Sequence, residues 1–403
     1  MKRTNVLWIS IDSLRKDFLH TYAPRDNRYT FLDELAEQGC VFDDAFPGGN
    51  WTMPSHASML TALDATSHMI WSWQHRFPEG TQTAFDFFHR AGYTLGCFAL
   101  PQLGALFSDL PIDYTGESHS INLMKCIESP KPFFVFWHTF NVHYPYGMVR
   151  PKDYDDAESD YDLSSRTLNY LRHLILTEQT EIILDSYRRE VQQAARFVQG
   201  IVAKLKKLGK FEDTYIILAA DHGEAWVKNT TFHQNFQEGV LRVPLAIIGP
   251  GIKPSRVSSP VSLTDLLPTV LELCGVTTDA ETATFDGVSL RPKLNASPIE
   301  ARHHVVIVGP NGGRARHRYL AVRNAQWMLV TAMNHWSESF HQIRENEAST
   351  NLLITTLPEA GRLALEEFRS IAERHTERLL SKKDNITELS DTTAKKLRAL
   401  GYV

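Results

Sequence analysis

A turn that leads into a helix is predicted at Asn50-Trp51-Thr52-Met53-Pro54-Ser55-His56-Ala57-Ser58-Met59-Leu60. Pro54 fits the first turn of a helix, because the N–H that proline lacks would have no intrahelical partner there. Thr52, two residues earlier, occupies the place of an N-cap residue. A hydroxyl at that point faces unpaired backbone N–H groups and the positive end of the helix dipole, where phosphate or sulfate can bind. A plain threonine cap is the alternative interpretation.

The composition is that of an ordinary globular protein, with 43% hydrophobic and 22% charged residues among 403. This length allows one large α/β domain with an appendage. The net charge of −5 gives no basic surface, so no nucleic-acid partner is expected. No apolar run approaches the roughly 20 residues of a membrane span, and the first one is too short for a signal peptide. Four scattered cysteines indicate buried thiols and a cytoplasmic protein: Cys40, Cys97, Cys126 and Cys274.

Strands and helices are predicted to alternate along most of the chain. Short apolar runs indicate buried strands at residues 6–11, 94–100, 133–137, 215–219 and 242–251. Helical periodicity covers residues 31–38, 55–63, 168–208 with a break near 177–180, and 264–273. This alternation favours an α/β fold with a mainly parallel central sheet and helices on both faces. We expect a catalytic domain over residues 1–286.

The remaining residues, 287–403, have a different pattern of predicted elements. Short strands with polar turns are predicted at residues 305–308, 319–322 and 327–330, and helices at 363–380 and 393–400. They indicate a smaller C-terminal α+β subdomain with a short antiparallel sheet. The basic residues within 314–318 and the acidic run at 153–162 are predicted to be solvated loops.

Polar residues follow two of the predicted strands. Asp12 follows the strand at 6–11, and Asp221 and His222 follow the strand at 215–219. Ligands of open α/β sheets bind beyond the carboxyl ends of strands, although a loop aspartate can also simply cap the next turn. Together with Thr52 these residues form a plausible site for one divalent ion. An ion there would lower the pKa of the Thr52 hydroxyl and make it a nucleophile in a two-step displacement.

Two histidines follow the aromatic strand at residues 133–137. His138 lies close to aromatic residues and is predicted to be a packed core side chain. His143 lies just past the end of the strand, so it is a better candidate for contacting substrate.

Residues 6–17 look like the opening of the sulfatase branch of the alkaline phosphatase superfamily. Five later stretches resemble the same branch in order: residues 52–61, 141–146, 220–224, 241–245 and 397–403. The resemblance spans nearly the whole chain.

This resemblance implies a role for each matched residue. Asp12, Asp221 and His222 would be metal ligands, with Thr52 as nucleophile and further ligand. His143 and His233 would touch the leaving group or the non-bridging oxygens, and either could be the general acid, since imidazole titrates near neutral pH. Arg15 would assist the anion.

Three residues depart from the sulfatase pattern. True sulfatases resemble one another in a Cys or Ser that is converted to formylglycine, whereas this chain has Thr52, whose Cβ methyl group prevents formation of that aldehyde. His56 stands where the motif has Arg. Ser13 stands where many sulfatases carry a second aspartate, and the lost carboxylate favours Mn²⁺ or Zn²⁺ over Ca²⁺ or Mg²⁺. One ion is expected, although His143 and His233 leave room for a second.

Superfamily members with an unmodified threonine act on phosphorus. We therefore expect a metal-dependent hydrolase, or a transferase to a small alcohol, that acts on phosphodiesters or phosphonate monoesters. The expected partner is a small anionic ester, with no nucleic acid or membrane, and a homo-oligomer is left open. One alternative is a sulfatase that works without formylglycine. Another is a non-catalytic metal-binding relic.

Overall fold

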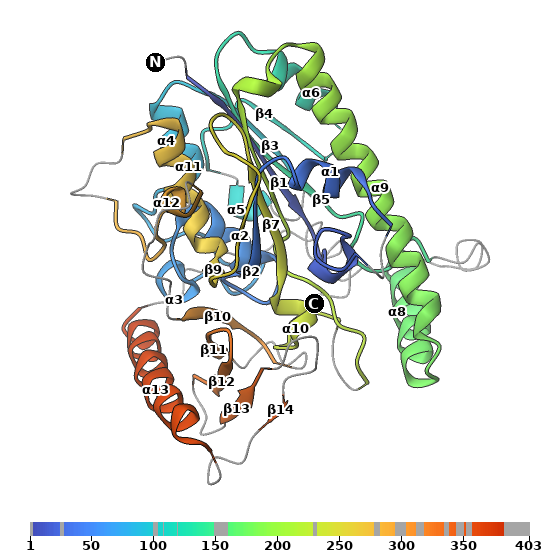
Figure 1. Ribbon diagram of the computed structural model, residues 1–403, viewed down its shortest axis with the longest axis vertical. Helices are drawn as coiled ribbons and strands as arrows, with labels where there is room; N and C mark the ends of the chain where they lie inside the picture. Colours follow the sequence, from blue (N-terminus) through green and yellow to red (C-terminus); the bar gives the residue numbers. More distant parts are fainter. Residues whose placement is uncertain are drawn as a thin grey trace.

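Two β-sheets form the framework of the protein (Figure 1). A computed structural model describes these residues: 3–24, 28–99, 104–107, 109–118, 120–148, 160–228, 232–277, 283–294, 304–311, 318–333, 338–343, 350–351 and 357–382.

The larger sheet has the strand order β4-β3-β5-β1-β6-β7-β2-β8, and β9 also pairs with β2. Its strands are β1 Asn5–Ile11, β2 Cys40–Phe46, β3 Thr94–Phe98, β4 Tyr114–Gly116, β5 Phe133–Thr139, β6 Thr214–Ala219, β7 Val243–Ile248, β8 Ser255–Val257 and β9 Val261–Ser262. The central strand β1 pairs in parallel with β5 and β6, and all seven of its residues are buried. The mainly parallel sheet is thus confirmed. β7 is the exception, because it runs antiparallel to both β6 and β2.

Helices cover both faces of this sheet, as predicted. In Figure 1, α1 (Phe31–Ala36), α8 (Asp160–Leu176) and α9 (Thr180–Lys207) lie on one side. The other side carries α2 (Thr52–Thr61), α3 (Ala65–His68), α4 (Ala84–Arg90), α11 (Leu266–Cys274) and α12 (Arg291–Leu294). The remaining helices are α5 Gly104–Phe107, α6 Ile121–Glu128 and α10 Glu238–Leu241, with 3-10 turns at Lys16–Phe18, Phe211–Asp213 and Leu263–Asp265.

The predicted break in the long helical stretch is confirmed, because α8 ends at Leu176 and α9 begins at Thr180. α9 is the longest helix described, and its buried residues repeat at helical spacing from Ile183 to Leu205. The prediction of a solvated loop for the acidic run at 153–162 is partly corrected. Residues 160–162 begin α8 instead of a loop, which suits carboxylates in a first helical turn, while 153–159 lie outside the described residues.

The second sheet is antiparallel and has the order β10-β11-β12-β13-β14. Its strands are β10 Val305–Gly309, β11 Tyr319–Arg323, β12 Trp327–Ala332, β13 Glu338–Gln342 and β14 Thr350–Asn351, and α13 (Glu359–Leu380) packs against β11 and β12. This agrees with the predicted C-terminal α+β part. The helix predicted at 393–400 and most of the basic loop, 314–317, lie outside the described residues, and the division at residue 286 stays a prediction.

The second sheet touches the turn that precedes α2. Val308 donates its N–H to Gly48 O (3.1 Å), and Asn50 donates its N–H to Val308 O (3.3 Å). The Asn50 side chain donates to Pro310 O at 2.8 Å and to Asn235 O at 3.2 Å. The C-terminal part therefore supports the segment that carries Thr52.

Among the described residues, no helix combines the length and the apolar character that crossing a bilayer requires.

Candidate active site

Thr52 is the first residue of α2, and the N-cap is Trp51. The prediction that Thr52 itself is the cap was therefore wrong by one residue. Trp51 has an extended backbone, and its carbonyl accepts the first helical hydrogen bond, from Ser55 N (3.3 Å). The Thr52 hydroxyl instead lies 3.4 Å from Asp12 Oδ2 and 3.2 Å from His222 Nε2. These contacts exclude the interpretation of Thr52 as a plain helix cap.

The structure brings the four predicted metal ligands together at one edge of the sheet. Asp12 directly follows β1, and Asp221 lies two residues after β6, the parallel neighbour of β1. One ligand atom each from Asp12, Asp221 and His222 can be chosen so that all lie within 4.8 Å of one another. Thr52, only 2% exposed, adds its hydroxyl to this group.

Ser13 orients both carboxylates. Its backbone is left-handed (φ 60°), which is uncommon for a residue other than glycine and typical of functional sites. In this conformation Ser13 N donates to Asp221 Oδ1 (3.2 Å) and Ser13 Oγ donates to Asp12 Oδ1 (2.8 Å). The Tyr187 hydroxyl donates to Ser13 O at 2.7 Å and holds the turn in place.

Among the described residues, neither carboxylate is paired with a lysine or an arginine. The hydrogen bonds and close ion contacts of the Asp12 and Asp221 side chains there involve Ser13, Thr52 and histidines, and neither Lys nor Arg. Burial would raise the pKa of Asp12, but interactions with His143 and other histidines outweigh it and hold the pKa well below its usual value. Burial and the charge of Asp12 raise the pKa of Asp221 well above its usual value. A cation would allow both groups to ionise.

His222 has the tautomer that a metal ligand needs. Its Nδ1 donates to the carbonyl of Gly223 (2.8 Å), so the lone pair of Nε2 faces Thr52. Burial lowers the pKa of His222 to about 4, which keeps the ring neutral. The donor set of two carboxylates, an imidazole and a hydroxyl thus fits a divalent ion held by Asp12, Asp221, His222 and Thr52.

His143 and His233 lie beside this group in different protonation states. His143 Nδ1 donates to Tyr144 O (2.7 Å), and burial lowers the pKa of His143 to about 3. Burial also acts to lower the pKa of His233, but the neighbouring Glu224 outweighs it and raises that pKa above its ordinary value. The two rings lie 5.1 Å apart between centroids, and that of His233 lies 4.8 Å from His222. Burial therefore keeps the pKa of His143 low, whereas Glu224 favours the protonated form of His233.

Arg15 is not brought into contact with Thr52. Its guanidinium donates to both carboxylate oxygens of Asp17 (2.9 and 2.6 Å) and to Glu224 O (3.2 Å), and it lies over the ring of Trp226. The role of Arg15 toward the anion stays a prediction.

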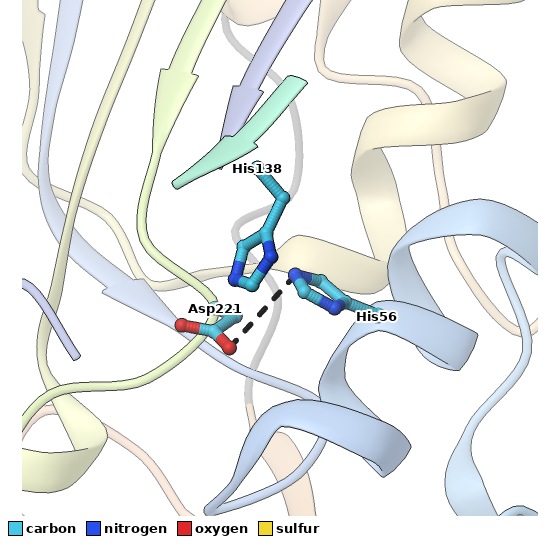
Figure 2. Close-up of side chains that lie close together, drawn as sticks. All are labelled: His56, His138 and Asp221. Atoms are coloured by element: carbon cyan, nitrogen blue, oxygen red, sulfur yellow. Dashed lines mark ion pairs between the residues drawn. The ribbon is translucent and has the colours of Figure 1, made fainter. Parts of the chain in front are cut away.

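Two buried histidines that were not among the predicted site residues lie beside Asp221 (Figure 2). His138 was predicted to be a packed core side chain, but its Nε2 lies 3.2 Å from Asp12 Oδ2. His56 Nε2 lies 3.8 Å from Asp221 Oδ2 and 3.0 Å from Ser10 Oγ. One signal was present for His56, since a residue four positions after Thr52 lies on the same helix face. The position of His138 could be predicted only from the register of β5 against β1, which places His138 opposite Ser10.

The sequence model of the sulfatase family matches residues 4–103 and 121–276, more than half of the chain. A Delta 4,5-hexuronate-2-O-sulfatase of Bacteroides thetaiotaomicron is 23% identical over 364 residues, covering 76% of this chain and 75% of that protein. Choline-sulfatase of Rhizobium meliloti is 26% identical over 226 residues, 56% of this chain but only 43% of the relative. This chain therefore matches less than half the length of that relative.

Solved structures share the fold. A phosphonate monoester hydrolase of Agrobacterium radiobacter aligns with a TM-score of 0.72 at 17% identity, covering 97% of this chain and 99% of that one. The 2-O GAG sulfatase BT1596 aligns with a TM-score of 0.71 at 18% identity, covering 97% and 96%. With the matched family model, the grouped Asp12, Thr52, Asp221 and His222 lead to one conclusion: the chain belongs to the sulfatase family.

Proposed function

We propose that the protein is a metal-dependent hydrolase of phosphodiesters or phosphonate monoesters, with Thr52 as the nucleophile. The observation that carries this proposal is the buried Thr52 hydroxyl, 3.4 Å from Asp12 and 3.2 Å from His222, at a position where a threonine cannot form formylglycine. The fold shared with phosphonate monoester hydrolases of Agrobacterium radiobacter and Silicibacter pomeroyi is compatible with it.

The residues suit a double displacement. Thr52 Oγ1, whose proton passes to solvent, forms a bond to phosphorus while the bond from phosphorus to the leaving oxygen breaks. Water later cleaves the Thr52 ester, and Thr52 leaves as the alkoxide. His233, protonated through Glu224, gives its proton to the leaving oxygen and then accepts one from the attacking water. A divalent ion bound by Asp12, Asp221 and His222 would lower the pKa of the Thr52 hydroxyl. If a small alcohol replaces water in the second step, the same residues catalyse transfer.

A sulfatase that works without formylglycine is the second candidate, and it is favoured by the family and by the names of the curated relatives. Thr52 would then carry a sulfo group as a sulfate ester. The two candidates differ in which ester is turned over and in the elements attached to Thr52.

The test compares turnover of an aryl phosphodiester, an aryl phosphonate monoester and an aryl sulfate with added Mn²⁺ or Zn²⁺. We expect the phosphorus esters to be turned over faster, and sulfate turnover far above both would reject the proposal. The Thr52 peptide is then analysed by mass spectrometry after an acid quench. A phosphorus ester should leave on Thr52 a phosphorus group that keeps its remaining organic substituent, whereas a sulfate ester should leave a sulfo group. A phosphorus adduct is the expected result.

We further propose that the substrate is a small anionic ester and that the protein works in the cytoplasm without a nucleic-acid or membrane partner. Four free cysteines, three of them buried, support a reducing compartment. Fractionation of cells that produce the protein tests its location.

A further inference from the structure

We propose that His56, His138 and Asp221 form a second cation site, which shares Asp221 with the site at Thr52. The three side chains come from separate elements: His56 from α2, one helical turn after Thr52; His138 from the end of β5; and Asp221 from the loop after β6. Figure 2 shows that they point toward one another.

The distances suit a small transition-metal ion. One ligand atom from each residue can be chosen so that all three lie within 4.8 Å of one another, and His56 Nε2 is 3.8 Å from Asp221 Oδ2. Ligands of a tetrahedral site with bonds of about 2.1 Å are separated by about 3.4 Å. His56 and Asp221 therefore need to move by only a few tenths of an ångström. The two imidazoles stand nearly perpendicular, with centroids 4.6 Å apart, so they approach the same point from different directions.

The second observation is an unpaired oxygen. Asp221 Oδ2 is fully buried and has no hydrogen-bond partner among the described residues, while Oδ1 accepts from the N–H groups of Ser13 and His222. An unpaired carboxylate oxygen in a dry interior is costly. This oxygen lies 3.8 Å from His56 Nε2 and 3.6 Å from His222 Nε2, so it is shared by both sites. A cation between Asp221, His56 and His138 would reduce this cost.

The chemistry of the donors defines the class of ion. Two imidazoles and one carboxylate favour Zn²⁺, Co²⁺ or Mn²⁺ over Ca²⁺ and Mg²⁺, which prefer oxygen ligands. His138 Nε2 also lies 3.2 Å from Asp12 Oδ2, so the two sites are in direct contact. The second ion would add positive charge next to Thr52. Among the described residues, no lysine or arginine contacts the Asp12 or Asp221 carboxylate.

The test counts bound ions, so its result does not depend on the reaction proposed for Thr52. All three side chains are buried, so the ion is supplied while the chain folds. The full chain is produced in zinc-depleted medium with Co²⁺, and cobalt per chain is measured by mass spectrometry of the elements. We expect two ions in the wild type and one in His138→Gln and His56→Arg, because the arginine supplies a fixed charge to Asp221 but cannot ligate.

His68→Gln is the matched control. His68 is as buried as His56 and is bonded to Ser58 on the same helix, but it is outside the cluster, so this variant should keep two ions. A crystal of the cobalt protein should show an anomalous peak between His56, His138 and Asp221, and this measurement decides the matter if the variants do not fold. One cobalt in the wild type, two in His138→Gln, or no anomalous peak at this place would overturn the proposal.

Discussion

His233 Nδ1 lies 3.4 Å from Glu224 Oε1. Burial alone would lower the pKa of His233, but this carboxylate outweighs burial and raises that pKa. The other oxygen of Glu224 accepts a hydrogen bond from the Tyr146 hydroxyl (2.9 Å), which in turn accepts one from Trp226 Nε1 (3.1 Å). Hydrogen bonds from Tyr146, and through it from Trp226, therefore fix the carboxylate that raises the pKa of His233.

Glu224→Gln should lower the pKa of His233 and remove part of the proton donation to the leaving group. We expect turnover at pH 8 to fall by about tenfold to 100-fold, with the alkaline limb of the pH profile shifted to lower pH. Activity should recover with an aryl leaving group that needs no proton. Glu272→Gln, at a partly exposed position that binds Ser289 and Arg291, is the control and should leave the profile unchanged. An unshifted alkaline limb in Glu224→Gln would contradict the role of His233.

Thr52→Ala should reduce turnover of the best phosphorus ester by at least about 10³-fold, because the attacking oxygen is lost. Thr52→Ser keeps the hydroxyl and should retain much more activity, with the adduct then found on the serine. Thr61→Ala removes a hydroxyl at the other end of α2 that donates to Ala57 O and accepts from Leu63 N, away from Asp12 and His222, and serves as the control. Unchanged turnover in Thr52→Ala would favour the non-catalytic interpretation of the site.

His375 should make the docking of α13 sensitive to acid. Its Nδ1 is bonded to Thr66 Oγ1 of α3 (2.8 Å), and burial, helped by Arg378, lowers the pKa of His375 to about 4. In the unfolded chain this pKa is about 6.5. The unfolded state therefore binds more protons between these values, and stability falls as the pH drops from 6.5 toward 4.

The largest loss from His375 is about 3 kcal/mol of unfolding free energy. Urea denaturation at pH 7 and pH 4.5 should show a smaller loss in His375→Gln than in the wild type. Equal losses in both proteins would show that the histidine is not buried in its neutral form.

Two glycine substitutions should change stability in opposite directions. A Cβ on Gly309 would collide with Asn50 Oδ1, so Gly309→Ala must displace the contact between β10 and the Thr52 turn. We expect a loss of about 2 kcal/mol or more in unfolding free energy, together with reduced turnover. Gly200 lies inside α9, and a Cβ added there would meet nothing within 4 Å, so Gly200→Ala should stabilise by about 0.5–1 kcal/mol. Denaturant titration measures both, and a neutral Gly309→Ala would contradict the tight contact.

The sequence predicted those features that depend on local pattern. The apolar run of β1 and the aspartate that follows it, the break between α8 and α9, and the change of texture at the second sheet are all visible in single segments. Features set by distant partners were not predictable. The direction of β7 could not be read from the sequence. A strand that is buried on both faces is apolar throughout, whether it runs parallel or antiparallel to its neighbours. His138 resembled a core residue because its partner, Asp12, is 126 positions away in sequence.

The pairing of β10 with the Gly48–Asn50 turn has a consequence for redesign of this protein. A library that aims at a new ester would naturally vary the loops around Thr52 and treat the C-terminal sheet as an exchangeable module. The backbone hydrogen bonds between Val308 and both Gly48 and Asn50 make that sheet part of the structure that positions the turn before Thr52. A chimaera with a different C-terminal sheet should therefore keep residues 305–310 of this protein unchanged. The junction with the foreign sequence should come after residue 310.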